Sequence, residues 1–149
     1  MSRYSASIAK AAPTTGTCVM MIRPAAGRTI SVVEVGFFMT TSVAAAPSIG
    51  LYRNATTGTP STSTLVQSEE MNGVAGTTNL DTAWSAAPTV NAIRNRGIIL
   101  PVSTIGAGWV WTFPEGKLKC SPGGTTQLCL WHFGAATIGA MEVYAVVEE

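Results

Sequence analysis

The chain has 149 residues, a formal net charge of +1 and a mean hydropathy of +0.29. Charged residues make up only 11% of it, against about 25% in an ordinary soluble domain, and its closest approach to a basic patch is Arg94 with Arg96. This composition argues against nucleic acid as the main partner and against a membrane span, because no apolar run reaches the ~20 residues that cross a bilayer.

The first third of the chain predicts three strands. Residues 3–9 alternate in polarity, and residues 17–22 form a continuous apolar run between Gly16 and Pro24, which is typical of a short buried strand. Residues 28–41 are rich in β-branched and aromatic side chains and form the longest strand candidate. Gly36 within it predicts a bend that would let one strand serve two sheets.

The middle of the chain alternates predicted strands with polar loops. Strands are predicted over 48–53, 64–68, 78–84 and 98–100, the last as an edge strand because Pro101 ends it. Residues 54–63 and 69–76 are rich in turn-forming residues and are predicted as exposed loops. Asn54 begins a formal glycosylation sequon, which we expect to be unused. Asp81 is expected to face away from the apolar side of its strand.

The aromatic stretch 108–133 predicts a meander of three strands joined by two turns. Trp109, Trp111 and Phe113 fall at alternate positions, so a strand places them on one face. Together with Trp131 they are expected in the centre of a sandwich core or in a seam between subunits. The turns are Pro-Glu-Gly at 114–116 and Pro-Gly-Gly at 122–124, and a last strand is predicted over 140–147.

These elements predict an all-β fold. About ten short strand candidates are separated by Gly and Pro, and no segment shows a sustained helical stripe. The long polar excursions between strands favour a jelly-roll β-sandwich over an up-and-down barrel. The length suits one such domain over residues 1–149, with residues 1–10 as an extended N-terminal arm or edge strand.

The sequence offers few residues for catalysis or metal binding. The single histidine, His132, has no nucleophile motif beside it, and the cysteines lack the close spacing of structural zinc sites. The sparse carboxylates do not pair in sequence. We therefore expect no enzyme, no metal and no cofactor. A carbohydrate-binding module is the alternative if a Trp proves exposed, because aromatic rings stack on apolar sugar faces.

Cellular location is inferred from the cysteines and the N-terminus. Cys18, Cys120 and Cys129 cannot all pair with one another, and we interpret them as buried free thiols. The N-terminus lacks the apolar block of a secretory signal. Both features fit synthesis and assembly in a reducing cytoplasm.

Four segments carry a resemblance to a known group of proteins. Residues 80–89 (LDTAWSAAPT), 108–116 (GWVWTFPEG), 130–134 (LWHFG) and 143–149 (VYAVVEE) occur in an order that resembles small virion proteins encoded by tailed bacteriophages. The resemblance implies a single jelly roll that forms homotrimers. It also implies a decoration or cement protein that binds the major capsid protein on the exterior of the virion head. It supplies no functional residues.

We predict which segments contact neighbouring subunits, because exposed loops and unpaired strand edges are free to bind another chain. These segments are the N-terminal segment 1–10 and the two polar loops. The residues concerned are Arg3, Tyr4, Ile8, Asn54, Thr57, Glu69 and Glu70. Two other functions stay open: a fibre or receptor-binding module that recognises glycans, and a major-shell or tail subunit that assembles without a scaffold.

Overall fold

The protein is built from antiparallel β-strands. The computed structural model describes residues 2–70, 73–123 and 125–149, and no helix occurs within these ranges, which confirms the predicted all-β class. The strands are β1 (Arg3–Lys10), β2 (Thr17–Arg23), β3 (Ile30–Met39), β4 (Ser48–Thr56), β5 (Thr59–Ser68), β6 (Ala75–Ala86), β7 (Thr89–Ile99), β8 (Gly108–Thr112), β9 (Lys119–Cys120), β10 (Leu128–His132) and β11 (Met141–Glu148).

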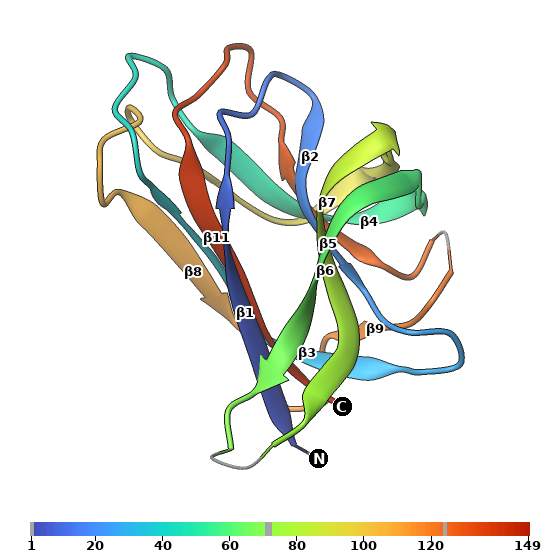
Figure 1. The fold of residues 1–149 in the computed structure, drawn as a ribbon. Helices are drawn as coiled ribbons and strands as arrows, with labels where there is room; N and C mark the ends of the chain where they lie inside the picture. Colours follow the sequence, from blue (N-terminus) through green and yellow to red (C-terminus); the bar gives the residue numbers. More distant parts are fainter. Residues whose placement is uncertain (1, 71–72, 124) are drawn as a thin grey trace.

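The strands form one sheet that curls into two facing layers (Figure 1). The strand order is β7-β4-β10-β2-β6-β5-β1-β11-β3-β8, and β9 also pairs with β3. One layer contains β7, β4, β10 and β2, the other contains β1, β11, β3 and β8, and β5 with β6 joins them. Over the described part of the chain, β7 and β8 are the two ends of this path. The arrangement fits a sandwich of the jelly-roll type.

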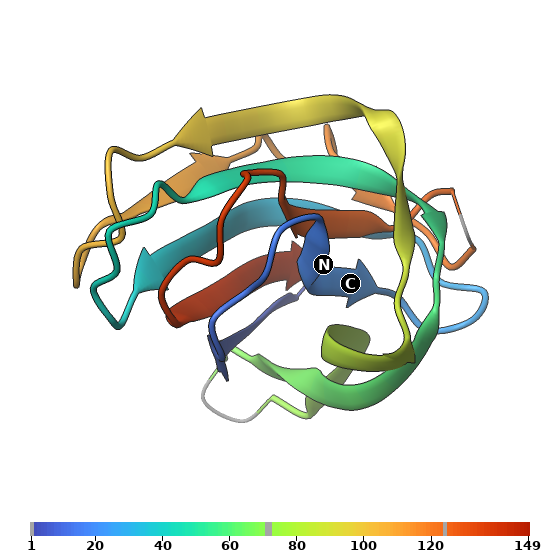
Figure 2. The same cartoon turned by 90° about the horizontal axis from the view of Figure 1, so that it is seen from above.

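A long two-stranded ribbon closes one side of the sandwich (Figure 2). β4 pairs with β7 and β5 pairs with β6, so residues 48–68 and 75–99 run together as one bent ribbon. The bend lies at Gly58, whose φ is 68°, and a Cβ there would stand 2.4 Å from the carbonyl oxygen of Ala86. Beyond the bend β6 pairs with β2 and β5 pairs with β1, which connects the layers.

The predicted exposed loop at 54–63 is wrong, because most of this range belongs to strands of the ribbon. β4 continues to Thr56 and β5 begins at Thr59, so only two residues separate the strands. Ser and Thr dominate this region because most of β5 is exposed, and the pairing with β6 supplies its backbone hydrogen bonds. Pro60 is accommodated at a register shift. Of the predicted loop at 69–76, residues 71–72 lie outside the described ranges and 75–76 belong to β6.

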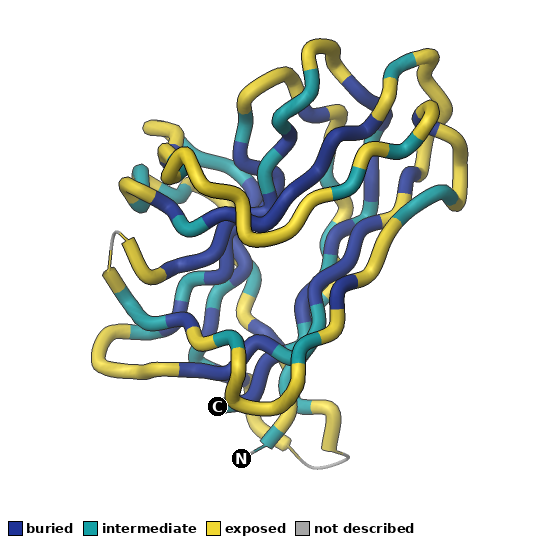
Figure 3. The backbone as a smooth tube through the Cα atoms, turned by 180° about the vertical axis from the view of Figure 1, so that it is seen from behind, coloured by how far each residue is buried: buried dark blue, intermediate teal, exposed yellow. Residues whose placement is uncertain are grey.

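The core lies between the two layers (Figure 3). Residues 18–22 of β2 are buried, as the apolar run predicts. Val19, Met20 and Ile22 share the core with alternate positions of β11 (Val143, Ala145 and Val147). Cys18 and Met21 form a second cluster with Cys129, against which Trp131 packs. β3 pairs with β11 over most of its length and stays within one layer, so the expected bend at Gly36 between two sheets is wrong.

The aromatic stretch is not a meander. β8 and β9 both pair with β3, whereas β10 pairs with β2 and β4 in the other layer. Trp111 is 8% exposed and packs near Phe37, with ring centroids 6.2 Å apart. Trp109 has the same parity but is 44% exposed, because β8 is at the end of the sheet. Trp109 is therefore not a core residue of the chain.

The N-terminal segment is part of the sheet. β1 pairs with β11 at all eight of its residues, from Arg3 opposite Glu148 to Lys10 opposite Met141. Its other side pairs with β5 at Tyr4 and Ser5. Residues 3–10 are therefore a strand of the sheet, paired with β11 along one side and with β5 only at Tyr4 and Ser5 on the other.

Candidate functional site

One end of the sandwich is formed by loops that contain no charged residue. Four loops meet there, on the upper side of Figure 1, while both termini lie at the opposite end. The loops are residues 11–16, 40–47, 100–107 and 133–140. The sequence contains 17 charged residues, nine Lys or Arg and eight Asp or Glu, and none of them falls in these loops. We call these four loops the uncharged end.

Large aliphatic side chains are exposed on this end. Ile105 is 68% exposed, and Val43 and Val102 are also exposed. Ile99, where β7 meets the loop 100–107, is 63% exposed. The other solvent-facing residues are Ala, Thr, Ser, Pro and Gly. An exposed surface with aliphatic side chains and no charge is typical of an interaction site.

Hydrogen bonds tie the loops of the uncharged end to one another. Val43 N–H donates to the carbonyl of Ser103 at 2.9 Å, and the Ser103 hydroxyl donates to the carbonyl of Ala45 at 2.9 Å. Ala140 N–H donates to the Thr41 hydroxyl at 2.7 Å. These bonds connect three of the four loops, so the exposed aliphatic side chains stand on an ordered surface that loses little entropy when a partner binds.

His132 is a structural residue of the same end. Its side chain is buried, and its ring nitrogens lie 3.1 Å from the carbonyl oxygen of Ser48 and 2.7 Å from that of Ala136. The ring therefore links the loop 133–140 to the start of β4. With both nitrogens engaged by backbone, His132 presents no free nitrogen to a substrate.

The opposite end of the sandwich carries charge. The turn 113–118 contains Glu115 and Lys117, and Glu69 and Glu70 are exposed in the loop that follows β5. Arg3 pairs with Glu148 at 3.1 Å. The molecule is therefore asymmetric along its strands, with solvated charges at one end and aliphatic side chains at the other.

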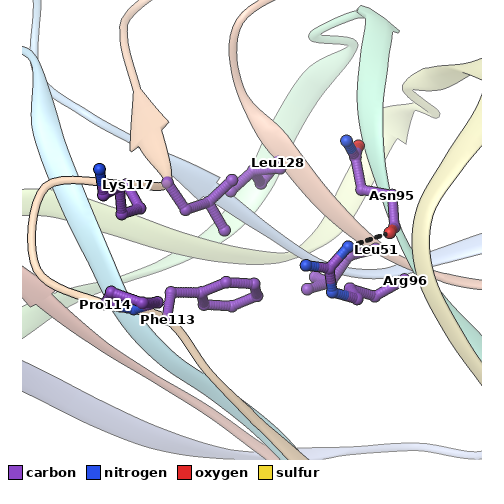
Figure 4. Close-up of a pocket in the computed structure, with 8 residues that line it drawn as sticks. Leu51, Asn95, Arg96, Phe113, Pro114, Lys117 and Leu128 are labelled. Atoms are coloured by element: carbon purple, nitrogen blue, oxygen red, sulfur yellow. Dashed lines mark hydrogen bonds between the residues drawn. The ribbon is translucent and has the colours of Figure 1, made fainter.

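A cleft of about 420 Å³ opens between β7 and the turn that follows β8 (Figure 4). Phe113 and Leu128 contribute apolar walls, and Arg96 and Lys117 stand at the rim. The Arg96 guanidinium donates to the backbone carbonyl of Asn95 at 2.8 Å. The long stems of such side chains commonly cover apolar surface while the charged group stays in water. The cleft marks the side of the sandwich that the ribbon does not close.

Two aromatic rings lie on the outer face of the β1-β11-β3-β8 layer. Phe38 and Tyr144 have parallel rings, 3° between planes and 6.1 Å between centroids. Gly36 makes room for Tyr144, because a Cβ there would stand 2.4 Å from the ring. The Tyr144 hydroxyl donates to Glu34 at 2.6 Å. Burial, together with this bond to a carboxylate, raises the pKa of Tyr144 well above its usual range.

The residues predicted to contact neighbours do not gather on one surface. Arg3, Glu69 and Glu70 are exposed at the charged end, where Glu69 N–H donates to the carbonyl of Arg3 at 3.0 Å. Tyr4 and Ile8 are partly buried against the core. Their side chains occupy the core-facing positions of β1, so they contribute to packing within the chain.

Two further predicted contact residues lie at the bend of the ribbon. Asn54 is fully buried, so its predicted place in an exposed loop is wrong, and its amide donates to the Gln127 side chain at 2.9 Å. Thr57 donates to the same Gln127 oxygen at 3.0 Å. These bonds hold the bend against the segment before β10. A buried asparagine cannot serve as a glycan acceptor.

Sequence reasoning missed the uncharged end. The available signal was a set of charge-free stretches, 35–52, 97–114 and 120–141, each of which contains one of its loops. What the sequence could not show is that the topology brings these stretches to the same end.

The buried thiols and the buried carboxylate of Asp81 are in structural positions. Cys18, Cys120 and Cys129 are buried free thiols, as predicted, and burial raises the pKa of Cys120 to about 12. Asp81 is fully buried and bonds Arg23 through both oxygens, at 2.6 and 2.9 Å. Across ranges 2–70, 73–123 and 125–149, no three His, Cys, Asp or Glu side chains stand close enough to hold a metal ion.

No protein family, curated protein or solved structure matches this chain. The part of the chain with assigned positions contains no helix long and apolar enough to cross a membrane.

Proposed function

We propose that the protein is a non-enzymatic virion structural protein that decorates an assembled phage head and stabilises it. The observation that carries the proposal is the uncharged end, where ordered loops present Val43, Val102 and Ile105 to solvent. This end docks on the outer surface of the major capsid protein, and the charged end faces water. The depletion of charge matches the cores of protein interfaces.

The proposed mechanism is bridging by many weak contacts. Each copy buries a modest apolar area, at about 25 cal/mol per Å², against more than one shell subunit. Copies that associate as a homotrimer engage the shell together, so the second and third contacts form at high effective concentration. Assembly in the host cytoplasm requires no covalent step, which fits three buried free thiols.

The test places a charge on each end in turn. Ile105→Lys puts an ammonium on the uncharged end, and Val74→Lys puts one at an equally open position, 76% exposed, at the opposite end. We expect the first variant to lose binding to heads that lack the protein, since an unpaired charge is costly to bury in an apolar interface. We expect the second to bind normally. Particle occupancy is measured after sedimentation, and circular dichroism verifies that both variants are folded.

Two outcomes would overturn the proposal. One is normal occupancy of folded Ile105→Lys with loss of folded Val74→Lys, which would move the docking surface to the charged end. The other is failure of the unmodified protein to bind any assembled head, including that of a phage whose genome encodes it.

A second candidate function is glycan binding by a fibre or receptor-binding module. It is favoured by the parallel rings of Phe38 and Tyr144 on the outer face of the layer. Trp109 is also exposed, but it lies opposite Phe37, on the other face. Glu34 and Glu142 on the same outer face supply carboxylates that accept hydrogen bonds from sugar hydroxyls. A glycan array with the intact protein and with Phe38→Ala tests this function, and binding that disappears in the variant would support it.

A further inference from the structure

A cavity of about 320 Å³ lies where β1 separates from the ribbon. β1 pairs with β5 only at Tyr4 and Ser5, so a gap opens between the end of β1 and strand β6. The cavity walls include Lys10, Pro13, Cys18, Ala83, Trp84 and Pro88. We call it the Lys10 cavity. It shares no residue with the cleft beside β7.

Lys10 is a cation at a core-facing position of its strand. It shares the parity of Tyr4, Ala6 and Ile8, which pack against the core. Its ammonium donates to the carbonyl of Thr82 across the gap, and it lies 5.6 Å from the centre of the Trp84 ring. Lys10 is partly buried, and this burial lowers its pKa.

No carboxylate neutralises this ammonium among the residues whose positions are described. The salt bridges there join Arg3 to Glu148 and Arg23 to Asp81. Glu142, on the outer face of its strand, accepts a hydrogen bond from Ser7. A lysine ammonium has three donors, and the Thr82 carbonyl uses one of them. A partly buried cation with free donors on a cavity wall is a site for an anion.

Trp84 contributes part of the cavity wall. Its indole Nε1 is buried and has no hydrogen-bond acceptor in the described structure. Buried polar groups are normally paired, and a buried donor without an acceptor is costly. The Lys10 cavity therefore combines an ammonium that has free donors with walls of Ala, Pro, Cys and Trp.

We infer that the Lys10 cavity binds a small organic carboxylate, with the carboxylate accepting from the Lys10 ammonium and an apolar body against the Trp84, Ala and Pro walls. A carboxylate fits better than a phosphate, because one cation balances one negative charge and phosphate sites usually gather several cationic groups. The mixture of apolar walls with a few polar groups is typical of small-molecule sites. This inference does not depend on the proposed capsid function.

The test uses the intact, ¹⁵N-labelled protein and compares benzoate with the neutral, equally shaped benzamide. The Trp84 indole resonance, assigned with Trp84→Phe, reports binding. We expect a saturable shift with benzoate, with a Kd of about 1 mM or below, and a Kd for benzamide at least about tenfold weaker, the effect of losing one charged hydrogen bond. Sodium chloride and inorganic phosphate at matched ionic strength should not reproduce the benzoate shift.

Variants separate the Lys10 ammonium from other cations. Lys10→Met should weaken benzoate binding about tenfold or more, Lys10→Arg should retain it, and Lys117→Met, at the rim of the other cleft, should leave it unchanged. Equal affinities for benzoate and benzamide, no saturable shift, or full binding by folded Lys10→Met would each overturn the inference. The comparison of the two probes needs no variant, so it decides the question even if Lys10→Met does not fold.

Discussion

At the scale of single residues, Glu149 shows how a carboxylate can hold two strands together. Its oxygens accept hydrogen bonds from Thr77 N–H at 2.9 and 3.0 Å, from the Thr77 hydroxyl at 2.8 Å and from Thr78 N–H at 2.8 Å. Burial alone would raise the pKa of Glu149, but these donors favour the charged form, and the net effect lowers it. The carboxylate thus fastens the end of the chain after β11 to β6.

The sign of this shift predicts the pH dependence. Because the folded pKa lies below the unfolded value of about 4.3, the stabilisation is fully present above that value and is lost as pH falls through the folded pKa. We expect Glu149→Gln to lower the free energy of unfolding at pH 7 by about 1 to 2 kcal/mol, a partly exposed charged hydrogen bond.

The difference between wild type and Glu149→Gln should shrink when urea unfolding is repeated below about pH 4. Glu70→Gln, at an exposed carboxyl, is the matched control and should change stability by no more than about 0.5 kcal/mol. If the difference in unfolding free energy between wild type and Glu149→Gln stayed constant below about pH 4, the charge of Glu149 would not be the source of the stabilisation.

Trp109 and Trp111 point to the same side of β8 but differ in burial, and this difference gives a second prediction. Trp111→Ala should cost about 3 to 5 kcal/mol, the range for large aromatic truncations in cores. Trp109→Ala should cost less than half as much, since 44% of Trp109 is already in water. Urea unfolding of both variants measures the difference. If both variants lost the same unfolding free energy, the edge position of β8 would not explain how much each Trp contributes to stability.

These residues show what sequence can and cannot supply at this scale. Alternation correctly placed Trp111 inside, but the exposure of Trp109 depends on β8 being an edge strand, and nothing within residues 108–112 states that. Asn54 is a similar case. Its polar neighbours predict a loop, whereas its burial depends on Gln127, more than seventy positions away in the chain.

Among the elements, the two-stranded ribbon formed by strands β4, β5, β6 and β7 bends at Gly58, and we expect the bend to depend on this residue. Its φ is 68°, and a Cβ added to it would stand within 3 Å of backbone atoms of residues 86–88. We expect Gly58→Ala to destabilise the protein by more than about 2 kcal/mol, since the left-handed conformation alone costs a non-glycine residue about 1 to 2 kcal/mol.

Gly106 supplies the control for this prediction. Its φ is 84°, also left-handed, but a Cβ there would meet no atom within 4 Å. Gly106→Ala should therefore show only the conformational cost of about 1 to 2 kcal/mol. Thermal and urea unfolding of the two variants compare them directly, and a Gly58→Ala cost no larger than that of Gly106→Ala would refute the proposed steric origin.

Strand identity was more predictable than strand partnership. The apolar run of β2, the alternation of β11 and the edge position of the segment ending at Pro101 are all local signals, and the structure confirms them. The pairing of β8 and β9 with β3 instead of with β10 is non-local. The long ribbon was missed because exposed strands rich in Ser and Thr have the composition of loops.

At the scale of the whole molecule, the separation of charge from aliphatic surface is the feature that sequence analysis did not provide. The low charge of the chain was evident, but its distribution depends on how the strands alternate between the two ends of the sandwich. Loops separated by more than 20 positions meet at one end because each connects strands that run in opposite directions.

This distribution predicts how attachment to a phage head responds to salt. Raising NaCl from about 0.1 M to about 1 M shortens the Debye length from about 10 Å to about 3 Å, yet the four loops of the uncharged end contain no charged residue, and the cations beside them are Lys10 and Arg94. Occupancy on purified heads should therefore stay constant or rise slightly, as apolar contacts are not weakened by salt. Urea below the unfolding midpoint should release the protein, because it solvates apolar and peptide groups. Release by NaCl combined with resistance to urea would show that charged groups hold the protein on the head.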